Sequence, residues 1–276
     1  MLLERDDEVA VLVKAVRETS AGPGAVLLVE GAAGAGRTAL LRHLGTIGHR
    51  AGVRVLRAGG VHAEQGFPLG VIRQLVMPLV VGPHALTNGV AAESPVSPMV
   101  RTLLAPLVNS SPSDAPAEPN PTVLGNVLQG LHLLFTALGE RQPVLLLVDD
   151  LHRADEPSLR ALAYLAQRRS GMRILIAVVP PHDQSPLLAE IAAVADYRVR
   201  AVPLSPEGVR RLVCDRFGGC DKEFVAACYD ASGGSPRDLR ELLNRAHSEH
   251  LLGRAADAPR IREFGAALHV AGVAVD

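Results

Sequence analysis

Residues 31–38 read Gly-Ala-Ala-Gly-Ala-Gly-Arg-Thr. This stretch departs at one position from the phosphate-binding pattern G-x-x-x-x-G-K-[ST], because Arg37 occupies the lysine position. An apolar run over residues 25–30 precedes it, and a helical pattern over residues 38–44 follows it. A glycine-rich loop between a buried strand and a helix is typical of a P-loop, in which backbone N–H groups and the positive end of the helix surround phosphates.

A second motif, Val144-Leu-Leu-Leu-Val-Asp149-Asp150, is an apolar run that ends in two carboxylates. An acid at the end of such a strand holds Mg²⁺, and the next acid orients or deprotonates the attacking water. We therefore predict Asp149 and Thr38 as Mg²⁺ ligands and Asp150 as the general base. The run alone also fits a strand followed by an Asp-capped turn, but its place about 110 residues after the glycine loop favours nucleotide chemistry.

The loop is predicted to bind the nucleotide along its whole length. The residues concerned are Gly31, Ala32, Ala33, Gly34, Ala35, Gly36, Arg37, Thr38 and Ala39. A guanidinium is larger and more planar than the compact ammonium that normally fits inside such a loop. With Arg37 and Asp150 as the predicted catalytic residues, we expect nucleotide binding to be retained but weaker and hydrolysis to be much reduced.

Five short apolar runs are typical of buried parallel strands, and helical patterns separate them. These runs cover residues 25–30, 53–58, 143–149, 173–179 and 197–203. The alternation predicts an α/β fold, namely a P-loop NTPase with a five-stranded parallel sheet between helices. Residues 83–121, rich in proline and serine, are predicted as an insertion and linker between the second and third strands, with a short helix over 99–107 that Pro106 limits.

After residue 203 the strand patterns stop and helical patterns take over. The first helix begins at Ser205-Pro206-Glu207, with the serine as N-cap and the proline in the first turn. Two more helices are expected, over residues 221–231 and 235–251. The predicted division is a P-loop nucleotide-binding domain over 1–203, a small all-α lid subdomain over 204–252 and an unassigned tail over 253–276.

Composition excludes several classes of protein. With 276 residues, 48% of them apolar, and a net charge of −1, the chain is expected to be globular, with no direct DNA contact and no attraction to an anionic membrane. No uncharged apolar run of about 18 residues and no signal peptide is visible, so we expect no membrane span and a cytoplasmic location. Three cysteines without a CxxC pair are predicted to be buried thiols rather than a disulfide framework or zinc ligands; they are Cys214, Cys220 and Cys228.

Besides these two motifs, the chain contains further short motifs, or boxes, in a defined order along the sequence. The whole series is Leu2-Leu-Glu-Arg5-Asp-Asp-Glu8, the loop, Phe67-Pro-Leu-Gly-Val-Ile-Arg-Gln-Leu75, Asp149-Asp-Leu-His-Arg-Ala-Asp155 and Ser232-Gly-Gly-Ser-Pro236. This series, over residues 1–252, resembles the N-terminal ATPase module of the large LuxR-type ATP-binding transcriptional regulators. Those proteins belong to the STAND class of signal-transducing P-loop ATPases, which is allied to the AAA-type fold.

The resemblance implies a five-stranded parallel sheet with a helical lid, and ATP or ADP with Mg²⁺ as cofactors. The family's R-x-x-E box, matched by Arg5 and Glu8, lies near the adenine, and its G-x-P motif approaches the nucleotide from the lid. Arg5 and Pro236 therefore join the predicted cofactor-binding residues, although Ser235-Pro236 by itself equally indicates a plain helix start.

Three departures from the family pattern bear on chemistry. Arg37 replaces the loop lysine, Arg153 stands where the family usually has tryptophan, and Pro180 stands where it often has an arginine that senses the γ-phosphate. The first and third predict that binding is kept while hydrolysis is eroded. Four lid arginines are weaker candidates for phosphate contacts, most of them expected to face solvent; they are Arg210, Arg211, Arg237 and Arg240.

The leading hypothesis is a nucleotide-dependent regulatory switch whose partners are a second copy of the chain or a regulatory protein. A working STAND-class ATPase, in which Arg37 substitutes adequately for lysine, is the first alternative. A small-molecule kinase is disfavoured because kinases do not need the water-activating acid at 150. A degenerate interaction module without nucleotide is the remaining alternative. The family's DNA-binding domain lies beyond the matched region, so DNA binding is not carried over to these residues.

Overall fold

The computed structural model describes residues 2–62, 66–80, 97–109, 120–180 and 185–272. The chain falls into two compact units, each of which is described by itself. The sheet unit contains Asp7–Glu30 and Leu40–Val199, and the loop–lid unit contains Met1–Asp6, Gly31–Ala39 and Arg200–Asp276. The phosphate loop and the N-terminal residues thus group with the helical part of the chain, which the sequence did not predict.

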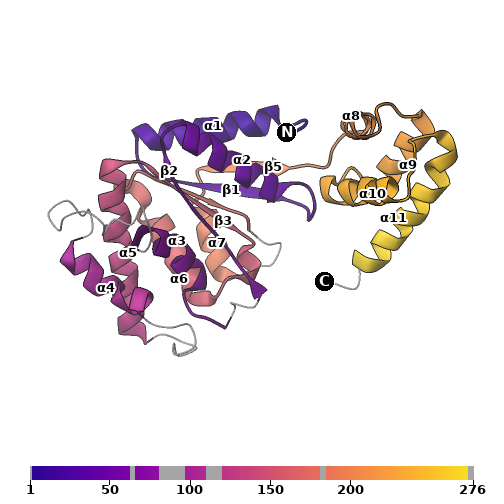
Figure 1. The fold of residues 1–276 in the computed structure, drawn as a ribbon. Helices are drawn as coiled ribbons and strands as arrows, with labels where there is room; N and C mark the ends of the chain where they lie inside the picture. Colours follow the sequence, from indigo (N-terminus) through magenta and orange to yellow (C-terminus); the bar gives the residue numbers. More distant parts are fainter. Residues whose placement is uncertain (1, 63–65, 81–96, 110–119, 181–184, 273–276) are drawn as a thin grey trace. The chain divides into compact units, whose positions relative to one another are not determined.

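The sheet has five strands, as predicted (Figure 1). They are β1 (Ala25–Gly31), β2 (Arg54–Gly59), β3 (Val144–Asp149), β4 (Ile174–Val178) and β5 (Tyr197–Ala201). Their order is β2-β3-β4-β1-β5, and the pairs β2–β3, β3–β4 and β4–β1 are parallel. The predicted α/β fold with a parallel sheet is confirmed.

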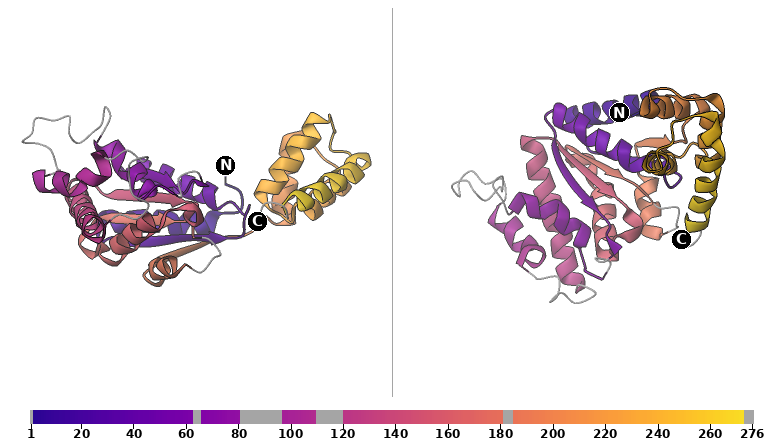
Figure 2. Two further views of the ribbon diagram at one scale, coloured as in Figure 1. Left: turned by 90° about the horizontal axis from the view of Figure 1, so that it is seen from below. Right: turned by 45° about the vertical axis from the view of Figure 1, so that its right-hand side comes forward.

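Helices cover both faces of this sheet. The helices that precede β5 are α1 (Asp6–Ala21), α2 (Arg37–Arg50), α3 (Gly70–Val80), α4 (Pro98–Asn109), α5 (Pro121–Arg141), α6 (Glu156–Gln167) and α7 (Pro186–Ala193), of which α4 packs on α5 and α3. In Figures 1 and 2, α1 and α2 lie on one face, and α3, α5, α6 and α7 lie on the other. The central strands β1, β3 and β4 are buried on both faces and are nearly continuously apolar, whereas the edge strands β2 and β5 include exposed arginines.

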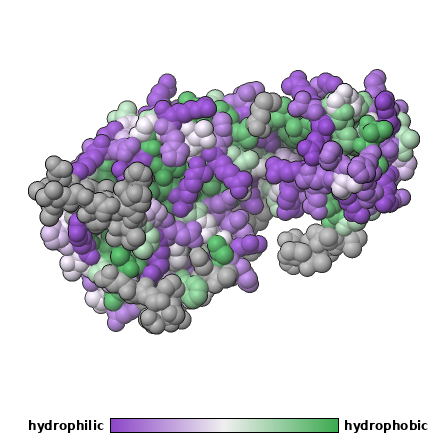
Figure 3. Space-filling view, viewed as in Figure 1, coloured by the Kyte–Doolittle hydropathy of each residue, from purple (hydrophilic) through white to green (hydrophobic). Residues whose placement is uncertain are grey.

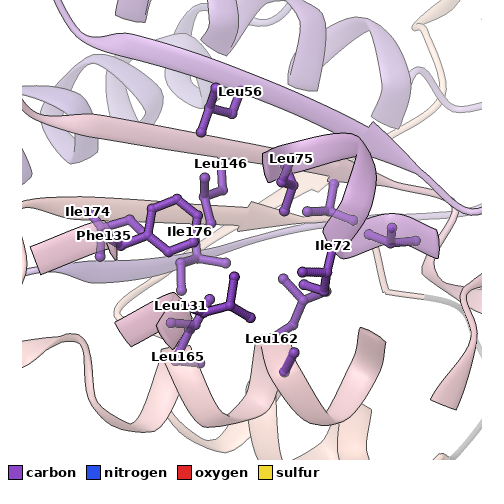
Figure 4. Close-up of a cluster of buried hydrophobic side chains, with 14 of the residues drawn as sticks. Leu56, Ile72, Leu75, Leu131, Phe135, Leu146, Leu162, Leu165, Ile174 and Ile176 are labelled. Atoms are coloured by element: carbon purple, nitrogen blue, oxygen red, sulfur yellow. The ribbon is translucent and has the colours of Figure 1, made fainter. Parts of the chain in front are cut away.

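Successive strand residues supply the two layers of the core. Leu146 and Ile176 point toward α5 and α6, where they pack with Phe135 (Figure 4). The intervening strand residues Leu145 and Leu147 face α2. There, Cβ atoms added to two glycines of α2, Gly48 and Gly45, would lie 2.8 and 2.9 Å from these leucine side chains. Glycine therefore lets α2 approach the sheet closely.

Helix α5 is the one helix, among the described residues, that is long and apolar enough to cross a membrane by length and composition. Its apolar side chains, however, are used in the core of the sheet unit. Leu131, Leu134 and Phe135 are at most 1% exposed and pack in the cluster that covers the sheet (Figure 4). Core packing accounts for the composition of this helix.

Helix α4 of the predicted insertion extends past Pro106, from Pro98 to Asn109, so it is longer than the helix predicted over 99–107. Val100, Leu104 and Leu107 are buried in the same core cluster. This packing compensates for the hydrogen bond that the proline cannot donate. Most of the predicted linker lies outside the described residues.

The loop–lid unit contains four helices among its described residues: α8 (Pro206–Phe217), α9 (Lys222–Ser232), α10 (Pro236–Ser248) and α11 (Ala258–Gly272). Ser205 and Ser235 are the N-caps of α8 and α10, as predicted, and accept from Gly208 N and Asp238 N. Helix α11 lies in the tail that the sequence left unassigned. Its Phe264 is 1% exposed and packs in one cluster with α8, α9 and α10.

The prediction of three unpaired cysteine thiols is wrong for two of them. Cys214, in the last turns of α8, forms a disulfide with Cys220, just before α9, with 5.1 Å between their Cα atoms. Helix α8 ends at Gly218 in the left-handed conformation, and this turn brings the two cysteines together. Cys228 remains a free, buried thiol, and burial raises its pKa to about 12.

Hydrophilic residues cover most of the face shown in Figure 3. The large apolar side chains that are exposed come from different segments of the described chain: Val13, Val61, Phe67, Met99, Val202 and Leu252. Single exposed apolar residues are normal on protein surfaces. The high apolar content of the chain is therefore explained by the two cores.

Candidate functional site

The phosphate loop owes its shape to three glycines in the left-handed region of backbone space. Gly31, Gly34 and Gly36 have φ values of 138°, 79° and 103°, which other residues adopt only with strain. A Cβ on Gly31 would lie 2.4 Å from the Ala201 carbonyl oxygen, and one on Gly34 would lie 2.6 Å from Ser235 Oγ. A Cβ on Gly36 would meet nothing within 4 Å, so the loop is open on that side.

Helix α2 begins directly after this loop, at Arg37. The first backbone N–H groups of a helix have no acceptor within the helix, and its positive end attracts anions. Thr38 is the second residue of α2 and, like Arg37 and Ala39, it is half-buried, whereas Ala32 and Ala33 are exposed. The predicted order of strand, glycine loop and helix is therefore present.

Arg5 holds the loop from the N-terminal side. Its side chain is only 5% exposed. The guanidinium donates to three backbone carbonyl oxygens, those of Glu4 (2.8 Å), Ala35 in the loop (3.3 Å) and Val202 after β5. Arg5 thus links the loop to the segment between β5 and α8.

A cavity of about 490 Å³ lies within the loop–lid unit. Its wall is formed by Leu2, Leu3, Arg5, Ala35, Gly36, Ala39, Leu204, Leu212, Asp215, Arg216, Pro236, Leu239, Arg240, Leu243 and Asn244. Six leucines make the wall largely apolar, and the volume lies in the range of small-molecule sites. Five of the predicted cofactor-binding residues meet here, namely Arg5, Ala35, Gly36, Ala39 and Pro236. Arg240, one of the four weaker lid candidates, lines the same cavity. The other loop residues belong to the same loop without lining this cavity.

The start of α10 is bonded to the phosphate loop. The Arg237 N–H donates to the Gly34 carbonyl at 3.2 Å, and the Leu204 N–H donates to the Gly234 carbonyl at 2.8 Å. Gly234 has a φ of 75°, and a Cβ there would lie 2.3 Å from the Leu204 carbonyl oxygen. The Gly234-Ser-Pro236 segment therefore begins a helix, as predicted, and this helix start contacts the phosphate loop. Its approach to a nucleotide stays a prediction.

Glu4, for which the sequence predicted no role, connects the N-terminal segment to the start of α8. Its carboxylate accepts from the backbone N–H of Ser205 at 2.9 Å and from the Ser205 hydroxyl. The hydroxyl first and the backbone N–H second lower the pKa of Glu4 below its ordinary value of 4.5. Glu8, the second member of the predicted R-x-x-E box, lies in α1 of the sheet unit.

We predict that Glu4→Gln destabilises the loop–lid unit at neutral pH and that this effect shrinks in acid. A carboxyl group whose pKa is lowered by folding stabilises the folded state above its unfolded pKa, and this contribution is lost as the pH falls through the folded pKa. Denaturant unfolding of both proteins at neutral pH and below pH 4.5 measures the difference. Glu241→Gln, an exposed substitution on α10, is the control. A difference that does not change with pH would contradict the assignment.

The two predicted acids lie at the end of β3 in the sheet unit. Asp149 is the last residue of the strand and its Oδ1 accepts from the Asp150 N–H at 3.0 Å. Asp150 has a φ of 49°, and both side chains are half-buried. Gly60, beyond the end of β2, donates its N–H to the Asp149 carbonyl at 3.1 Å, and a Cβ on it would lie 2.3 Å from the Asp150 carbonyl oxygen.

Asp155, five residues after Asp150, is a buried carboxylate for which the sequence predicted no role. It is 6% exposed and is the N-cap of α6. Its oxygens accept from Leu69 N (2.6 Å), Gly70 N (3.0 Å), Ser158 N (2.8 Å) and Ser158 Oγ (2.6 Å). Asp155 therefore connects two of the ordered sequence boxes, 67–75 and 149–155. Its one carboxylate accepts from backbone N–H groups at the start of α3 and at the start of α6.

Comparison with known proteins places this geometry in a family. The model of the AAA ATPase domain matches residues 1–179. Among solved structures, the ORC2 protein of Aeropyrum pernix in ADPNP-ADP complexes gives a TM-score of 0.56 at 15% identity, covering 96% of this chain and 68% of that one. The ORC1 protein of Aeropyrum pernix in complex with DNA gives 0.57 at 14% identity, covering 95% and 65%.

A RuvB mutant of Thermotoga maritima gives a TM-score of 0.52 at 10% identity, covering 95% of this chain and 70% of that one. At such identities the structural likeness shows the fold alone, and the chain spans about two thirds of the length of these proteins. A comparison with curated proteins finds no match. The family match extends over more than half of the chain, which therefore belongs to the AAA ATPase domain family.

Proposed function

We propose that this AAA ATPase domain binds ATP or ADP in the cavity of the loop–lid unit and acts as a nucleotide-dependent regulatory switch. The observation that carries the proposal is the leucine-lined cavity whose wall includes Ala35 and Gly36 of the phosphate loop. An apolar cavity accepts the flat face of a base, while the loop and the start of α2 supply N–H groups for phosphates. The solved ORC2 protein, similar in fold, is described in ADPNP-ADP complexes.

The donor set fits Mg²⁺. A hard cation takes oxygen ligands from carboxylates, hydroxyls and phosphates. Asp149 uses Oδ1 for the Asp150 N–H, and a carboxylate has several acceptor sites beyond that one. Thr38 supplies a hydroxyl at the second position of α2. Mg²⁺ would supply positive charge to offset that of the phosphates. Asp149 and Thr38 are its predicted ligands, and Asp150 is predicted to accept a proton from the attacking water.

The switch is favoured over the enzyme by two substitutions and one contact. Arg37 replaces the loop lysine and Pro180 follows β4 where the resembling family often has an arginine. The contact is the hydrogen bond that the Arg237 N–H donates to the Gly34 carbonyl. Through it the lid helix α10 touches the loop that would bind the phosphates. A change at the phosphates would then bias the position of α10, which is what a two-state switch requires.

The ordered sequence boxes support a role in a regulator of the LuxR type, with a second copy of the chain or a regulatory protein as the partner. DNA contact is not part of the proposal, although the similar ORC1 structure holds DNA. The net charge of −1 gives this chain no basic footprint for phosphate backbones.

Calorimetry with ATP and ADP, with and without Mg²⁺, tests the proposal. We expect the wild type to bind both nucleotides, and Thr38→Ala and Asp149→Ala to lose about tenfold or more of the Mg²⁺-dependent part of the affinity. Thr46→Ala on the same helix is the matched control, because Thr46 is exposed and its hydroxyl bonds only its own helix, at Arg42. Absence of nucleotide binding by the wild type would instead favour the degenerate interaction module.

A further inference from the structure

Strand β2 lies at one edge of the sheet, so among the described residues no further strand pairs with its outer side. At Gly59, the last residue of β2, the side chain of Gln74 from α3 takes that place. The Gly59 N–H donates to Gln74 Oε1 at 3.0 Å, and Gln74 Nε2 donates to the Gly59 carbonyl at 3.0 Å. A primary amide offers the same donor and acceptor as a peptide group, so Gln74 replaces one residue of a further strand.

This pairing is located at the level of the two acids. Gly59 is in register with Asp149 across the β2–β3 pair. The next residue, Gly60, donates to the Asp149 carbonyl, and it approaches Asp150 so closely that a Cβ would lie 2.3 Å from the Asp150 carbonyl oxygen. Gln74 therefore bonds the residue next to Gly60, and Gly60 is the residue that contacts the backbone of both acids.

Helix α3 is also fastened to the acids from the other direction. Asp155, which follows Asp150 by five residues, accepts from the N–H groups of Leu69 and Gly70 at the start of α3. The contacts form a closed ring within the sheet unit, from Gln74 through the end of β2, the two acids and Asp155, and back to α3. A ring closed on both sides resists rotation of the segment it encloses.

The enclosed segment needs such support. Asp150 has a φ of 49°, a left-handed conformation that a residue with a side chain holds only when its surroundings impose it. We propose that Gln74 is a positioning residue that sets the placement of Asp149 and Asp150, and thereby the Mg²⁺ dependence of nucleotide binding. This role rests on the proposed function. A displacement of about 1 Å in a catalytic group typically costs about 10²-fold in rate, so a small shift is measurable.

The test compares Gln74→Met, which keeps the length and loses the two hydrogen bonds to Gly59, with Gln74→Glu, which keeps an acceptor for the Gly59 N–H and loses the donor to the Gly59 carbonyl. Gln167→Met is the matched control, since Gln167 is exposed and bonds Glu190. ATP affinity is measured by calorimetry in EDTA and in Mg²⁺, well below the unfolding temperature of each variant. We expect both Gln74 variants to lose at least about tenfold of the Mg²⁺-dependent gain, with the affinity in EDTA unchanged.

If Gln74 had only a structural role, its variants would have a lower unfolding temperature and would either lose ATP affinity equally in EDTA and in Mg²⁺ or lose none. Either result overturns the positioning role. Retention of the Mg²⁺-dependent gain in both Gln74 variants overturns it as well, while the proposed nucleotide binding stands. Absence of nucleotide binding by the wild type, or of any Mg²⁺ dependence, refutes the proposed site itself and the positioning role with it. If Gln74→Met does not fold, Gln74→Glu alone decides, because one of its two hydrogen bonds is kept.

Discussion

Replacing Arg37 by lysine is expected to raise ATP turnover by about 10²-fold, the size of one preorganised contact to transition-state charge. Arg37 is the first residue of α2 and is half-buried at the end of the glycine loop. A lysine ammonium is compact and has three donors that turn toward phosphate oxygens, whereas a planar guanidinium needs more room and a fixed direction of approach. The same charge is thus placed better by lysine.

Phosphate release at saturating ATP, with nucleotide affinity measured in parallel, checks this prediction. Separate values for turnover and affinity show whether lysine improves the chemical step or only binding. Arg50→Lys, at the exposed far end of α2, is the control for a simple exchange of arginine for lysine. Equal turnover in the wild type and in Arg37→Lys would favour the alternative of a working ATPase in which arginine suffices.

Removing the carboxylate of Asp155 is expected to lower the free energy of unfolding of the sheet unit by about 3–5 kcal/mol, because each buried donor left without an acceptor costs about 1–3 kcal/mol. Four donors bond this carboxylate, three backbone N–H groups and the Ser158 hydroxyl. The loss also removes the N-cap of α6. Such a change is a large share of the stability of an ordinary domain.

Denaturant unfolding of Asp155→Ala measures the loss, and hydrogen exchange of the Leu69 and Gly70 amides locates it. Glu156→Ala is the neighbouring control. Its side chain is 63% exposed and pairs with Arg160, so its removal is expected to change the stability by less than about 1 kcal/mol. A change at Asp155 no larger than at Glu156 would show that the buried carboxylate contributes little.

Short-range patterns predicted the strands and helix starts well. The five apolar runs became the five strands. Burial on both faces selects apolar residues at nearly every position of the central strands β1, β3 and β4, whereas the edge strands β2 and β5 carry arginines. Ser205 and Ser235 were recognisable as N-caps because the bond they make reaches only three residues along the chain. Gly31 and Gly36 were recognisable from the spacing of the loop motif, and together with Gly34 they adopt left-handed backbone, which glycine adopts without strain.

Features that depend on distant partners were not predicted. Asp155 bonds Leu69 across 86 positions of sequence, so its role in the 149–155 box was invisible before the chain was folded. The Cys214–Cys220 disulfide was misjudged, because only the turn after α8 brings the two sulfurs together. Helix α4 passes Pro106 because its apolar residues pack in the core, a tertiary gain that outweighs local propensity.

Local patterns were enough to predict the class of fold, the glycine loop, the two acids at the end of β3 and the two serine-capped helix starts, because each follows from residues that are neighbours in the chain. Only folding brings Arg5 and Pro236 into the wall of one cavity with the loop, pairs Gln74 with Gly59 and places Asp155 on the N–H groups of Leu69 and Gly70. These arrangements join residues from separate strands, loops and helices. Their partners are chosen by packing and by the hydrogen-bonding needs of buried groups, which no local pattern records.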